Sequence, residues 1–135
     1  MSLARIASTY LVTTVVFFAV DMLWLGVVAK GFYRKQLGPL LSEQVNWPAA
    51  IAFYLLFIAG ILLFVVFPAL DKGSLGRVVL LGALVGLVTY ATYDLTNLAT
   101  LRGFPPLVAA VDMAWGMVLT AAVAAAGFLF ARELG

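Results

Sequence analysis

Apolar residues gather into four long runs that are separated by short polar stretches. The runs cover about residues 6–28, 48–67, 78–98 and 107–130. Each is about the 20 residues that an α-helix needs to cross the hydrocarbon core of a bilayer. None shows the period-two alternation of a membrane β-barrel strand, and a helix satisfies its backbone polar groups internally. The pattern therefore predicts four transmembrane helices.

Prolines and short connections mark the ends of these runs. Pro48 and Pro106 stand at the first turn of the second and fourth runs, and Pro68 ends the second. The connection over residues 101–106 is so short that the third and fourth spans should be antiparallel neighbours. The first run is too long for the apolar region of a signal peptide, so we expect it to be retained as a span. We expect a single integral membrane domain over residues 1–135.

The connection over residues 30–46 is the longest and mixes apolar with polar side chains. The apolar set is Phe32, Tyr33, Leu37, Leu40 and Leu41, and the polar set is Arg34, Lys35, Gln36 and Glu43. This composition is typical of a segment that lies in the headgroup plane. The expected fold is an all-α membrane protein, a four-transmembrane-helix bundle with an interfacial segment between helices one and two.

The amino-acid composition argues against several kinds of cofactor and partner. The chain is 65% hydrophobic and 10% charged, whereas soluble domains carry about 25% charged residues. It has no cysteine and no histidine, so we expect no disulfide, no zinc site and no haem with a histidine ligand. No lysine lies within a run, so no Schiff-base chromophore is expected. The net charge of +2 is scattered, which predicts no nucleic-acid surface.

The basic residues do not define an orientation. With four spans, both termini and the second connection share one side, the terminal side, and the first and third connections share the other, the loop-one side. The terminal side carries Arg5, Lys72, Arg77 and Arg132, and the loop-one side carries Lys30, Arg34, Lys35 and Arg102. Because the split is even, the positive-inside rule leaves two interpretations open. One is a single orientation with weak bias, and the other is dual topology with an antiparallel homodimer.

Three of the six acidic residues lie inside the apolar runs: Asp21, Asp94 and Asp112, called the aspartate layer below. A charged residue at a helix centre costs about 2.5–3.5 kcal/mol on insertion scales. Counted from the nearest flanking residues at the rise of an α-helix, all three lie about 9–14 Å from the loop-one side. Three helices should therefore bring carboxyl groups to one depth, and Tyr54 of the second span reaches the same level.

Other side chains are candidates to line a site at this depth. Trp24 and Trp115 each follow an aspartate by three residues and share its helix face. Tyr90 and Asn97 flank Asp94 at spacings of four and three. The candidate ligand or ion-binding set is Asp21, Asp94, Asp112, Asn97, Tyr54, Tyr90, Trp24 and Trp115. The basic residues Arg34, Lys35 and Arg102 are candidates for structural or lipid-headgroup contacts.

Several functions are compatible with such a layer. It could bind an ion, a proton or a small ligand, and translocate it, and this is the interpretation that we favour. A membrane enzyme acting on a lipid or isoprenoid through carboxylates is an alternative. An accessory subunit whose aspartates bind a partner's basic residues is another. Pairing with Arg34 or Arg102, or hydrogen bonding across helices, would instead make the aspartates structural. The membrane is expected to surround the chain in every case.

Several segments resemble a known family. They are Phe32-Tyr33-Arg34 with Leu37-Gly38, the string from Tyr90 to Thr100, and Asp112-Met113-Ala114-Trp115-Gly116. The whole chain is similar to a bacterial family of predicted membrane proteins known as domain of unknown function 2177. The resemblance implies a multi-pass protein of the bacterial inner (cytoplasmic) membrane and supplies no activity.

Overall fold

The computed structural model describes residues 1–135 as helices joined by short connections, with no strand. The helices are α1 (Leu3–Leu23), α2 (Lys30–Leu37), α3 (Trp47–Ile61), α4 (Phe67–Leu70), α5 (Leu75–Thr100) and α6 (Pro106–Glu133). Wider π-helical turns at Trp24–Val28 and Leu62–Val66 extend α1 and join α3 to α4. The four resulting spans, Leu3–Val28, Trp47–Leu70, Leu75–Thr100 and Pro106–Glu133, are long and apolar enough to cross a membrane. The predicted four-helix architecture is confirmed.

Local hydrogen bonds define where three of the spans begin. The hydroxyl oxygen of Ser2 accepts from the backbone N–H of Arg5 at 3.1 Å, and that of Ser74 accepts from Arg77 at 3.1 Å. The side chain of Asn46 does the same for α3. Each satisfies one of the four backbone donors that a helix leaves unpaired at its N-terminus. The fourth span begins instead with a proline, which lacks that donor.

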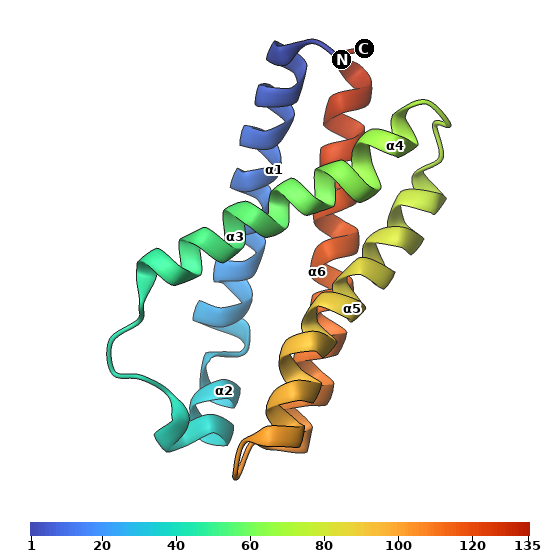
Figure 1. Cartoon of the computed structure of the whole chain (residues 1–135). Helices are drawn as coiled ribbons and strands as arrows, with labels where there is room; N and C mark the ends of the chain where they lie inside the picture. Colours follow the sequence, from blue (N-terminus) through green and yellow to red (C-terminus); the bar gives the residue numbers. More distant parts are fainter.

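Helices α5 and α6 lie side by side and antiparallel along most of their length, as predicted (Figure 1). Small residues permit this close approach. A Cβ atom added at Gly86 would overlap the carbonyl oxygen of Gly116, and one added at Gly82 would lie 3.0 Å from the Cα of Ala121. The small residues at positions 82 and 86 therefore act as the packing surface that their spacing predicts.

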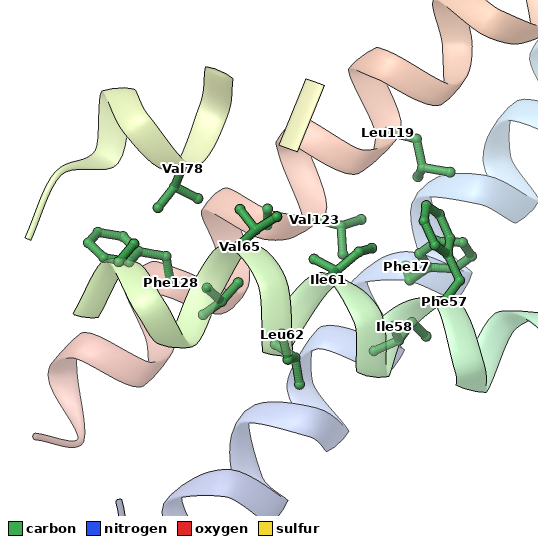
Figure 2. Packing of buried hydrophobic residues seen from close by; sticks show 13 residues of the cluster. Phe17, Phe57, Ile58, Ile61, Leu62, Val65, Val78, Leu119, Val123 and Phe128 are labelled. Atoms are coloured by element: carbon green, nitrogen blue, oxygen red, sulfur yellow. The ribbon is translucent and has the colours of Figure 1, made fainter. Parts of the chain in front are cut away.

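The buried apolar core fills the half of the bundle on the terminal side. Figure 2 shows its members, which come from α1, α3, α4, α5 and α6 and from the wide turn between α3 and α4. The completely buried ones include Phe17, Ile58, Val78, Leu119 and Phe128. No carboxyl group of the aspartate layer belongs to this cluster. Along α1, α5 and α6, the aspartates lie on the loop-one side of the core residues Phe17, Val78 and Leu119.

The long first connection folds back against the loop-one end of the bundle. It contains α2, whose Phe32, Tyr33 and Leu37 pack against a small buried cluster of Phe104, Val108 and Ala109. Its remaining apolar residues, Leu40 and Leu41, stay exposed. Helix α2 therefore covers the beginning of α6, close to the depth of the aspartates.

Candidate functional site

The structure brings the three aspartates of separate helices close to one another. Asp21 on α1 and Asp94 on α5 are 3% and 0% exposed, and Asp112 on α6 is half-buried. The carboxyl group of Asp112 is near enough to interact with both of the others. Asp112 on α6 therefore lies near an aspartate of α1 and an aspartate of α5, whereas the common depth of all three stays a prediction from the helical rise.

Two tryptophans and one tyrosine connect α1, α2 and α6 at this level. The indole Nε1 of Trp115 donates to Asp21 at 3.1 Å, across α6 and α1. The hydroxyl of Tyr33 donates to Asp112 at 2.8 Å and accepts from the indole of Trp24 at 3.1 Å. The two indole rings stack with centroids 4.4 Å apart. Trp115 of α6 is therefore bonded directly to Asp21 of α1. Trp24, in the extension of α1, is connected to Asp112 of α6 through Tyr33.

Tyr33 is a stable donor in this network. Burial, reinforced by the neighbouring charge of Asp112, raises the pKa of Tyr33 above its ordinary value. A phenol whose pKa is raised in this way keeps its proton throughout the physiological range. The hydroxyl group therefore remains able to donate to Asp112 whatever the protonation state of that carboxyl group.

Asp94 differs from its two neighbours. Neither of its carboxyl oxygens has a hydrogen-bond partner, although the residue is completely buried. Its carboxyl group faces that of Asp112 on the neighbouring helix. Two carboxylates that share a site cannot both remain ionised without a proton or a cation between them. The arrangement at Asp94 is therefore complete only when such a positive charge is present.

Basic residues do not neutralise this layer. The structure contains a single ion pair, between Arg132 and Glu133 at the terminal side. The hypothesis that Arg34 or Arg102 reaches into the bilayer to pair with an aspartate is wrong, because both side chains end in exposed positions on the loop-one side. No group of three or more acidic side chains is arranged to hold one metal ion. The layer is therefore a set of pairwise contacts.

A cavity of about 470 Å³ opens beside the layer, a size within the usual range for small-molecule sites. Asp21 and Asp112 contribute its carboxyl groups, and no basic residue lines it. Its remaining walls are mainly aromatic and come from α3, α5, α6 and the wide turn that extends α1: Phe53, Tyr54, Tyr90, Tyr93 and Trp115, with Leu25, Ala50 and Thr89. We call it the first cavity.

A second cavity of about 230 Å³ lies under α2. Leu25, Tyr93 and Asp112 line both cavities, so they form the wall between them. Tyr33, Leu37 and Leu41 close the second cavity from the side of the first connection. Asp112 is therefore reachable from two directions.

Most of the other candidates from the sequence also reach the site. Tyr54 faces Asp21 across the first cavity, and the ring of Tyr90 lies over Gly116, where a Cβ atom would overlap it. Trp24 takes part through its bond to Tyr33. Asn97 lines neither cavity and lies one turn beyond Tyr93. Lys35 is exposed on α2 and contacts no aspartate.

Sequence reasoning missed three participants: Tyr33, Phe53 and Tyr93. Tyr33 was assigned to the headgroup plane because it lies outside the apolar runs, and its bond to Asp112 joins residues 79 positions apart. Tyr93 and Phe53 directly precede the candidates Asp94 and Tyr54 in the sequence, and this proximity is the only signal that the sequence contains for either of them.

The four spans and the intramembrane carboxyl groups together define a polytopic α-helical membrane protein with a buried acidic site. The model of a family described as "Predicted membrane protein (DUF2177)" matches residues 6–129. The chain belongs to this family. No match was found among curated proteins or among solved structures.

Proposed function

We propose that this membrane protein binds a proton or a small positively charged ligand at Asp21, Asp94 and Asp112, within the bilayer. The observation that carries the proposal is the state of Asp94, which is completely buried with both carboxyl oxygens unpartnered. A buried polar group without a partner lowers stability by about 1–3 kcal/mol. Such a group is expected where a proton or ligand completes the site.

Access to the layer is compatible with binding and release. Asp112 lines both cavities, and Asp94 contacts it from behind. Toward the terminal side, the apolar core around Phe17 and Leu119 fills the bundle, and the buried polar side chains there are the hydroxyl groups of Thr9, Thr13 and Thr120. The two cavities that Asp112 lines lie on the loop-one side of this core, so translocation would require the helices around it to separate.

The two alternatives receive less support from the geometry. An enzyme acting on a phosphorylated lipid would need a positive group for the phosphate, and no basic residue lines either cavity. An accessory subunit would present an aspartate on its outer surface, whereas Asp21 and Asp94 are enclosed by the chain's own helices. Binding by the layer itself accounts for both observations.

The bacterial cytoplasmic membrane is the location that we propose. The four spans are apolar α-helices, and proteins that span the bacterial outer membrane are β-barrels. The family resemblance agrees with this location. It is tested by fractionating the two membranes of a Gram-negative host: recovery with the outer membrane would overturn it.

Infrared difference spectroscopy of the protein in lipid bilayers tests the binding function. The wild-type protein should show the carbonyl stretch of a buried protonated carboxyl group, and Asp94→Asn should lose it while remaining folded. Asp71→Asn is the matched control, because Asp71 lies exposed in the connection between α4 and α5 and should leave the band unchanged. A wild-type spectrum without a protonated carboxyl group, under conditions with no cation available, would overturn the proposal.

A further inference from the structure

An apolar groove adjoins the first cavity on its terminal side. It has a volume of about 390 Å³ and shares Phe53 and Thr89 with that cavity. Its other walls are apolar and comprise Val85 on α5 and six residues on the α3 side: Leu56, Phe57, Ala59, Gly60, Leu63 and Phe64. Gly60 lies among them, and a Cβ atom there would meet nothing closer than 4.0 Å. The groove and the first cavity thus form one path with an acidic end and an apolar end.

This path opens sideways, toward the lipid. Helix α5 packs against the span of α3 near its C-terminal end, over the wide turn and α4. Figure 1 shows the N-terminal half of α3 diverging from α5, and both of these helices contribute residues to the lining of the first cavity. Phe53 and Tyr93 at its mouth are 42% and 59% exposed. In a bilayer, these exposed rings would contact acyl chains.

The acidic end has the chemistry of a cation site. Asp21 and Asp112 supply negative charge, and aromatic faces surround them. Carboxylates and aromatic rings together attract an organic ammonium group through charge and cation–π interactions. A phosphate or carboxylate headgroup would instead be repelled, because no basic side chain lines the path.

We propose that the ligand is a cationic amphiphile that enters from the bilayer between α3 and α5. Its ammonium head lies between Asp21 and Asp112, and its apolar chain lies in the groove beside Gly60. This inference rests on the proposed function and adds the class of ligand and its route. It needs no covalent step, since binding replaces a proton or water by the ammonium group.

Calorimetric titration of the protein in lipid nanodiscs, with empty nanodiscs subtracted, tests the ligand class. The probes share a ten-carbon chain and differ in the head: decyltrimethylammonium, decanol and decanoate. Tetramethylammonium serves as the head without a chain. We expect decyltrimethylammonium to bind at least about tenfold more tightly than each of the other three. Equal binding of decanol would show an apolar site only, and tighter binding of decanoate would show an anion site; either result overturns the inference.

Variants separate the two ends of the path. Asp112→Asn should weaken decyltrimethylammonium by about tenfold or more, because the charge is lost while the shape is kept. Gly60→Leu should fill the groove and weaken the same probe, yet leave tetramethylammonium unchanged. Gly76→Leu is the matched control, since Gly76 lies in a helix far from the groove and should change neither. If Gly60→Leu leaves decyltrimethylammonium binding intact, the groove does not hold the chain.

The two proposals fail in different ways. If the infrared band depends on Asp94 but decyltrimethylammonium binds no better than decanol, the ligand class is wrong and the proton-binding function stands. If no protonated carboxyl group exists and no probe binds, both proposals are wrong. Folding of each variant is checked by circular dichroism and by its elution volume in detergent, so that a loss of binding is not confused with a loss of structure.

Discussion

Trp115 on α6 donates a hydrogen bond of 3.1 Å to Asp21 on α1, ninety-four residues earlier in the chain. The donor follows Asp112 by three residues, so one turn of α6 contributes both an acid to the layer and a partner for another acid. The structure thus makes Asp21 a stabilised carboxyl group and leaves Asp94 without a partner. This difference leads to the first prediction.

Asp94→Leu should leave the free energy of unfolding unchanged or raise it, because the substitution removes a buried carboxyl group that accepts no hydrogen bond from a backbone, indole or hydroxyl group and that faces the carboxyl group of Asp112. Asp21→Leu should lower it by about 1–3 kcal/mol, because the buried N–H of Trp115 loses its acceptor. Unfolding in mixed micelles, followed by circular dichroism, measures both. If Asp94→Leu proved the more destabilising of the two, Asp94 would be a structural residue.

Tyr33→Phe should loosen α2 from the bundle. The substitution removes the donor to Asp112 and the acceptor for Trp24, while the ring can still pack against the cluster around Phe104. We expect faster amide hydrogen exchange throughout α2, since fewer contacts then oppose its local opening. Tyr10→Phe makes the same chemical change at a remote hydroxyl that donates to Leu55. Equal exchange in α2 of both variants would show that the Tyr33 bond does not hold α2.

Gly86→Ala should destabilise the protein by about 1–3 kcal/mol or more, because the added methyl group would overlap Gly116 on α6. Gly31→Ala should be neutral or stabilising, because a Cβ atom there meets nothing within 4 Å and alanine favours a helix. Thermal unfolding of the two variants provides the comparison. If Gly86→Ala unfolds at the same temperature as the wild type, α5 and α6 do not approach each other closely at Gly86.

Single cysteines test the topology, and the absence of native cysteine makes the labelling unambiguous. Ser74→Cys and Gly103→Cys lie in connections at opposite ends of the bundle. With one orientation, an impermeant maleimide added to sealed cells should label only one of them. The other interpretation left open by the even split of basic residues, a dual topology with an antiparallel homodimer, predicts that each cysteine is labelled to about half.

Much of the fold follows from patterns that extend over a whole span. Apolar length defined the four helices, and the short connection over residues 101–106 indicated that α5 and α6 would be antiparallel neighbours. The common depth of the aspartates followed from the regular rise of a helix. None of these features depends on contacts that are distant in the chain.

The finer geometry of the site depends on such distant contacts. Asp94 lacks partners because the packing of α5 against α6 sets the rotation of its helix. Tyr33 reaches Asp112 because the chain turns back after Val28, and the first cavity exists because α3 is tilted away from α5 (Figure 1). Asn97, at a promising spacing from Asp94, lies beyond both cavities. The spacing of residues within one helix therefore does not predict the environment of Asp94, the bond of Tyr33, the first cavity or the place of Asn97.

The central claim is that Asp94 and Asp112 form one shared site within the bilayer. The most direct test is an infrared titration in lipid bilayers of protein with isotopically labelled aspartate, comparing the wild type with Asp94→Asn. The label reports all four aspartates, so the difference between the two titrations is compared: if the groups share a site, removing Asp94 should change the titration of the aspartates that remain. If the titration of these remaining aspartates is the same with and without Asp94, the two carboxyl groups are independent and the claim is wrong.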